Sequence, residues 1–101
     1  MTKETARRIK SYMVSVVENG SGENAYLEDC GAGGKTASAQ TGKKDENDVE
    51  IVDAWFSGFF PAENPKYVIV VLNEGMSSGG KYAAPVFKEI AQEIQLLEKY
   101  R

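Results

Sequence analysis

The sequence predicts an α+β fold in which an N-terminal and a C-terminal helix flank a three-stranded antiparallel sheet. Two amphipathic patterns of helical period lie over residues 3–18 and 83–100. Between them, three stretches have strand composition, over about residues 35–40, 54–60 and 67–73. The 101 residues are a single-domain length, so we expect both helices to pack against one small sheet.

The first helix is predicted over residues 3–18. Thr2 is suited to cap its first turn, and the glycine-containing run at residues 19–22 supplies residues that tolerate positive φ and end the helix. Its apolar residues recur at spacings of three and four, which places them on one face: Ala6, Ile9, Met13 and Val16 or Val17. We interpret this segment as an amphipathic packing helix.

The first two strands follow a turn-rich segment at residues 23–34. Two glycines lead into the first strand, at about residues 35–40. Residues 41–48 are charged and lack apolar side chains, which predicts a solvated loop. The second strand, at residues 54–60, is rich in aromatic residues and ends at Pro61.

The third strand, residues 67–73, is a nearly continuous β-branched run, which predicts burial on both faces. It is nevertheless the last strand of the predicted meander, so one of its edges has no partner within the chain. Natural proteins avoid exposed edges of this kind. We therefore expect strands of a larger parent protein, or a second copy of the chain, to cover it.

The final helix is predicted over residues 83–100, after a flexible glycine-rich loop at residues 75–80. Pro85 is tolerated in its first turn. Its apolar stripe is predicted to consist of Ala83, Phe87, Ile90, Ile94 and Leu97.

The composition excludes several classes of function. The chain contains no histidine and a single cysteine, Cys30, which excludes histidine-based triads, histidine-ligated metals and an internal disulfide. We expect no metal and no cofactor, and a buried or half-buried Cys30 that is not a nucleophile. The net charge of -3 argues against nucleic acid. The longest apolar run is too short for a membrane span, and no targeting segment is visible.

The stretch at residues 33–40, Gly-Gly-Lys-Thr-Ala-Ser-Ala-Gln, combines small residues, hydroxyls and one lysine. Because it has no bulky side chain, it predicts a backbone that another group approaches closely.

The run at residues 35–40, followed by the segments 54–61 and 63–71, resembles the C-terminal part of penicillin-binding protein transpeptidase domains. Gly79-Gly80, followed by residues 83–87, continues the resemblance into the last helix. The Trp-Phe-x-Gly-Phe-x-Pro run at its distance from Lys-Thr makes the match specific, and class B enzymes of the sporulation or division type look most similar. The resemblance implies that residues 1–101 form a single fragment, the C-terminal portion of the penicillin-binding/β-lactamase-like transpeptidase fold.

The resemblance also implies roles for four residues of the first strand. Lys35 would place positive charge beside the active-site hydroxyls and the substrate carboxylate, and Thr36 would hydrogen-bond that carboxylate. Ser38 would offer its backbone N–H to the oxyanion hole and its carbonyl to the substrate amide. Ala37 stands where the family usually has glycine, and its methyl group adds crowding that puts normal β-lactam affinity in question.

Two other motifs of that family, a Ser-x-x-Lys nucleophile and a Ser-x-Asn, precede the Lys-Thr strand. The chain contains no Ser-x-Asn. Its Ser-x-x-Lys, Ser78 to Lys81, follows the strand and holds two glycines, so we interpret it as a coincidence. The fragment is therefore predicted to be inactive alone.

The resemblance further implies the nature of the parent protein. It would be a bacterial enzyme that cross-links peptidoglycan stem peptides as a D,D-transpeptidase through a serine acyl-enzyme and binds β-lactams. It would lie at the cell membrane with this domain outside the cytoplasm, although this chain carries no membrane segment.

Two alternatives remain open on the sequence. Residues 31–36 superficially match a phosphate-binding loop, although Asp29 stands where that loop needs its first glycine, and a helix must follow Lys-Thr. The chain could instead be a non-catalytic module that pairs a sheet edge with a partner strand, or with a copy of itself through residues 67–73.

Overall fold

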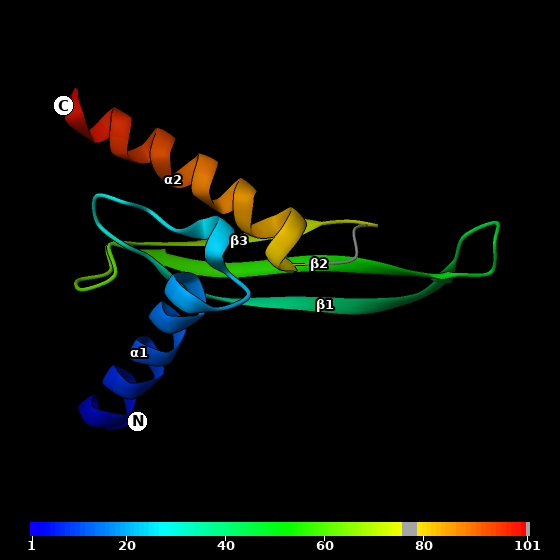
Figure 1. The fold of residues 1–101 in the computed structure, drawn as a ribbon, viewed down its shortest axis with the longest axis horizontal. Helices are drawn as coiled ribbons and strands as arrows, with labels where there is room; N and C mark the ends of the chain where they lie inside the picture. Colours follow the sequence, from blue (N-terminus) through cyan, green and yellow to red (C-terminus); the bar gives the residue numbers. More distant parts are fainter. Residues whose placement is uncertain (76–78, 101) are drawn as a thin grey trace.

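The structure is a computed structural model that describes residues 1–75 and 79–100 of the chain. A three-stranded antiparallel sheet, preceded along the chain by one helix and followed by another, confirms the predicted α+β fold (Figure 1). The elements in chain order are α1 (Lys3–Asn19), the 3-10 turn η1 (Glu23–Ala25), β1 (Gly33–Lys44), β2 (Glu50–Phe60), β3 (Tyr67–Asn73), the π-helical turn η2 (Gly79–Ala83) and α2 (Ala84–Lys99).

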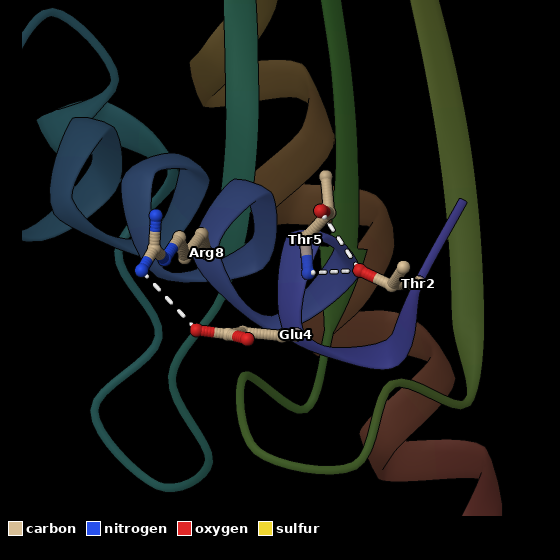
Figure 2. Close-up of polar contacts among 4 residues, drawn as sticks. All are labelled: Thr2, Glu4, Thr5 and Arg8. Carbon is tan, nitrogen blue, oxygen red and sulfur yellow. Dashed lines mark hydrogen bonds and ion pairs between the residues drawn. The ribbon is translucent and has the colours of Figure 1, made fainter.

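Figure 2 shows the start of α1, where Thr2 caps the first turn as predicted. The backbone amide of Thr5 donates to the Thr2 hydroxyl over 3.1 Å. Arg8 and Glu4 form an exposed ion pair of 3.2 Å in the next turn. Exposed pairs of this kind add little stability, so the cap contributes more to where the helix begins.

The sheet has the strand order β1-β2-β3, so β2 is its central strand. Phe56 of β2 lies opposite Thr36 of β1 and Val71 of β3 in the register. Phe56 and Val71 are buried. Because side chains alternate along each strand, this row marks the face of the sheet that holds the core.

The prediction that residues 67–73 are buried on both faces is wrong. Val68, Val70 and Leu72 of β3 are exposed by 74%, 59% and 40%, whereas Val71 is buried. The alternation arises because β3 is an edge strand and α2 packs on one face of it. Among the described residues, β3 pairs with β2 alone, which agrees with the expected unpaired edge.

The β1–β2 hairpin is longer than predicted. Residues 41–44, expected in a solvated loop, belong to β1, and β2 already begins at Glu50. The register shifts after Gln40, at a bulge that contains Gly42 with φ of +77°. Backbone ladder bonds need no apolar side chains, so the exposed hairpin continues as a two-stranded arm beyond the helices (Figure 1).

α2 crosses the core face of the sheet and anchors there through Phe87. The ring of Phe87 lies 5.0 Å from that of Phe56 and 6.1 Å from that of Phe60, measured between centroids. The stripe predicted for this helix is partly wrong, since Ile90 and Leu97 are exposed by 38% and 68%. The small residues Ala84 and Ala91 instead join Phe87 in facing the core and let the helix come close to the sheet.

The two glycines in the stretch 33–40, Gly33 and Gly34, pack under aromatic rings. A Cβ added to Gly33 would lie 2.3 Å from Cζ of Phe59, and one added to Gly34 would lie 2.3 Å from Cζ of Phe56. The groups that approach this backbone closely are therefore side chains of β2.

Candidate functional site

A cavity of about 400 Å³ lies where four segments meet: the turn after α1, η1, the middle of β1, and η2. Its polar lining offers three kinds of hydrogen-bonding group, namely hydroxyls, an amide and charged side chains. The lining residues are Gly20, Ser21, Glu23, Asn24, Thr36, Ala37, Ser38, Gly80 and Lys81.

The four site residues predicted from the sequence all lie on β1, and the structure brings three of them to this cavity. Thr36, Ala37 and Ser38 line it. Lys35 is exposed and is not among the described residues that line it; its ammonium group donates to the carbonyl oxygen of Thr36. Lys35 and Thr36 are thus neighbours along the strand; their side chains leave it toward opposite faces of the sheet, but the Lys35 ammonium extends back to the Thr36 carbonyl.

The turn after α1 and the adjoining η1 are parts of the site that sequence reasoning missed. Ser21 Oγ lies 2.9 Å from Oγ1 of Thr36, within hydrogen-bonding distance. The side-chain amide of Asn24 donates to the carbonyl oxygen of Gly80 over 2.9 Å. The sequence marked residues 19–22 only as a helix end, because contacts across 15 and 56 positions leave no local signal.

Two glycines hold Ser21 in place from either side. The backbone amides of Gly20 and Gly22 both donate to the carbonyl oxygen of Val16, each over 3.0 Å. Gly22 is buried, and a Cβ there would lie 3.1 Å from Cγ1 of Val16. The turn is therefore fixed to the last turn of α1, and Ser21 is presented to β1.

The Ser-x-x-Lys sequence lies partly outside the described residues, since Ser78 is not among them. Gly79, Gly80 and Lys81 belong to η2, so the flexible loop predicted for residues 75–80 does not extend to its last two positions. A Cβ on Gly80 would lie 2.2 Å from the carbonyl oxygen of Ser21, which makes glycine the residue that fits this contact. Lys81 follows it and brings a cation to the cavity.

Cys30 lies away from the cavity and is half-buried, as predicted. The side-chain amide of Gln95 donates to its sulfur over 3.2 Å. Burial, and to a smaller extent the neighbouring Asp29 carboxylate, raises the pKa of the Cys30 thiol. A raised pKa disfavours the thiolate, which is the nucleophilic form.

A phosphate-binding loop is not supported by the structure. Lys35 and Thr36 lie inside β1, whereas that motif needs them at the start of a helix. In residues 1–75 and 79–100, neither α1 nor α2 is both long and apolar enough to cross a membrane.

Comparison with known proteins places these features in a family. The sequence model of one protein family, described as the penicillin binding protein transpeptidase domain, matches residues 1–92. Stage V sporulation protein D of Bacillus subtilis is 37% identical over 100 residues, which cover 92% of this chain and 15% of that protein. Peptidoglycan D,D-transpeptidase MrdA of Haemophilus influenzae is 31% identical, over 96% of this chain and 17% of that protein.

Solved structures show the same similarity. The transpeptidase domain of the FtsI4 D,D-transpeptidase from Legionella pneumophila superposes with a TM-score of 0.77 at 30% identity, covering 94% of this chain and 37% of that one. The transpeptidase domain of penicillin-binding protein 3 from Burkholderia pseudomallei gives 0.74 at 29% identity, covering 90% and 29%. The chain thus spans well under half of each of these four protein chains.

Proposed function

The chain belongs to the penicillin-binding protein transpeptidase family, and on that premise we propose that it forms one wall of a D,D-transpeptidase active site. The complete domain cross-links peptidoglycan stem peptides through a serine acyl-enzyme and is acylated by β-lactams. It acts at the cell membrane, outside the cytoplasm. Support comes from the relatives that are described as peptidoglycan D,D-transpeptidases.

The observation that carries the proposal is the placing of Thr36 and Ser38 on one cavity at a sheet edge. The Thr36 hydroxyl binds the terminal carboxylate of the stem peptide, and the Ser38 amide donates to the carbonyl oxygen that becomes an oxyanion. Among the described residues β1 pairs with β2 alone, so its other edge has no strand partner, and in this proposal an extended peptide adds there as a strand.

Lys35 supplies positive charge to the same carboxylate in this proposal. Its ammonium donates to the carbonyl oxygen of Thr36, one residue from the hydroxyl that the substrate meets. Because the Lys35 side chain is exposed, it exchanges this bond for a carboxylate without exposing any buried group. The Lys35 ammonium and the Thr36 hydroxyl then bind the same substrate carboxylate from adjacent positions on the strand.

The isolated chain binds but does not react. Acyl transfer needs a serine activated by a base and held against an oxyanion hole. The chain contains no Ser-x-Asn, and its Ser-x-x-Lys sequence follows the Lys-Thr strand, whereas the family's precedes it. What this chain keeps is recognition of the carboxylate and part of the oxyanion hole.

Titration with N-acetyl-D-alanyl-D-alanine, followed by the backbone amide signals of the chain in NMR spectra, tests this function. We expect the signals of Thr36, Ala37 and Ser38 to shift, with affinity on the order of millimolar because half of the site is missing. The L,L dipeptide is the matched control. Equal shifts with both stereoisomers, or shifts away from β1, would contradict the proposal.

A second candidate function is self-association through β3. Its outer edge is unpaired among the described residues, and Val68, Val70 and Leu72 give it an exposed apolar face. In this reading the chain is an interaction module whose β3 pairs with a partner strand or with another copy of itself.

A further inference from the structure

Ser21 and Thr36 form a pair of hydroxyls that joins the turn after α1 to β1. Their oxygens are 2.9 Å apart, and both residues line the 400 Å³ cavity. Each hydroxyl has one proton and two acceptor lone pairs, so only one of the two donates within the pair. The direction of that bond decides what Thr36 is able to offer a ligand.

A carboxylate in the cavity fixes this direction. If Ser21 donates to Thr36, the Thr36 proton is left for the ligand, whereas the opposite direction consumes it. An oxygen that accepts a hydrogen bond also becomes a better donor, because the bonds in a chain polarise one another. A ligand anion therefore favours the order Ser21 to Thr36 to carboxylate.

We propose that Ser21 is a positioning residue for carboxylate recognition, acting through its hydrogen bond to Thr36. The inference rests on the proposed function, since it assigns a second residue to the same carboxylate contact. The Ser21 hydroxyl holds the Thr36 side chain in one rotamer and turns its proton toward the ligand. Ser21 lies outside the Lys-Thr strand and reaches it only through the fold.

The backbone around Ser21 supports a fixed role of this kind. Gly20 and Gly22 on either side are both bonded to the carbonyl of Val16. On the other flank, Gly80 contacts the Ser21 carbonyl so closely that an added Cβ would lie 2.2 Å away. A serine held on both sides loses little further freedom when it orders Thr36.

The test compares the affinities of N-acetyl-D-alanyl-D-alanine and its C-terminal carboxamide, measured on the full chain by amide shifts. Wild type is expected to prefer the acid. Ser21→Ala lowers affinity for the acid about 5-fold, the scale of one hydrogen bond between neutral groups, and leaves affinity for the carboxamide unchanged. Ser21→Thr keeps the hydroxyl, so this variant is expected to retain the wild-type preference for the acid.

Coupling to Thr36 is measured by a double-mutant cycle. In a Thr36→Val background, Ser21→Ala is expected to cause no further loss, because the residue it acts through is gone. Ser11→Ala is the matched control, since Ser11 is an exposed serine of α1 that does not line this cavity. Ser21→Cys keeps the size with a weaker donor and gives an intermediate loss, which decides the matter if the alanine variant fails to fold.

Two results would overturn the inference while leaving the proposed function intact. One is a Ser21→Ala protein with the full wild-type preference for the acid. The other is an equal loss for acid and carboxamide, which would show a purely structural role. A wild-type chain that binds acid and carboxamide equally would instead refute carboxylate recognition itself.

Discussion

The ring of Phe56 lies over Gly34, so closely that a Cβ on Gly34 would sit 2.3 Å from Cζ of the ring. The two residues are on neighbouring strands, and the same ring contacts Phe87 of α2. Gly34 therefore sets how deeply the central strand's aromatic side chain enters the core. Its position immediately before Lys35 links the core to the edge that we propose binds substrate.

Gly34→Ala is expected to destabilise the chain by about 1–3 kcal/mol, the usual cost of overpacking a core. Urea unfolding followed by circular dichroism measures the change. In a Phe56→Leu background the added methyl group has room, so the same substitution should cost less than in wild type. Costs that simply add would show that Phe56 is not the obstacle.

Ala37→Gly is expected to strengthen binding of N-acetyl-D-alanyl-D-alanine several-fold. Ala37 lines the cavity, and removing its methyl group lets the peptide approach the strand. The glycine should also lower the free energy of unfolding by about 0.5–1 kcal/mol, because it is more flexible in the unfolded chain. An unchanged or weaker affinity would mean that the methyl group does not face the ligand.

Fluorescent penicillin is not expected to label the chain covalently, because the chain contains no Ser-x-Asn and its one Ser-x-x-Lys follows the Lys-Thr strand. Denaturing gels after incubation provide the measurement, with a complete transpeptidase domain as the positive control. A stable label that disappears in Ser78→Ala would show that the Ser-x-x-Lys sequence at residues 78–81 is reactive after all.

Cys30 is expected to react with iodoacetamide more slowly in the folded chain than in urea at pH 8. Its pKa is raised, chiefly by burial, so less thiolate is present at that pH in the folded state. Asp29→Asn removes the smaller cause and should increase the rate modestly, whereas Asp48→Asn in the hairpin loop should not. Equal rates for folded and unfolded chains would contradict the burial argument.

Val70→Lys is expected to reduce self-association of the chain. Val70 is exposed by 59% on β3, and a charge beside a free edge opposes pairing with another chain. Val49→Lys is a matched control, since Val49 is also exposed by 59% but lies in the β1–β2 loop. Light scattering over a range of concentrations distinguishes the two, and a wild-type chain that stays monomeric throughout would refute association through β3.

The sequence was sufficient for the order of elements, because helical and strand patterns are local properties. It failed at β3, where the β-branched run was interpreted as doubly buried. The composition of a segment indicates whether it forms a strand, whereas the exposure of Val68 and Val70 depends on which face of the sheet a helix covers. The hairpin length was missed for a related reason, since residues 41–44 are held by backbone bonds that leave no apolar pattern.

The candidate site, too, was predicted from the sequence only in part. Thr36 and Ser38 were found because they lie within one short motif. Ser21 and Asn24 were not, because their partners Thr36 and Gly80 are brought to them by the fold. Gly34 was recognised as a position of close approach, but the approaching group is the ring of Phe56 within the chain itself.

The strand order β1-β2-β3 leaves two different edges on the sheet as described, and this sets the symmetry available to any assembly. Pairing of β3 with β3 is isologous and closes after two copies. Pairing of β3 with the outer edge of β1 is heterologous and leaves a new edge at each step, so it grows without closing. A peptide bound along β1 would occupy the edge that growth requires, so ligand would limit the chain to a twofold dimer.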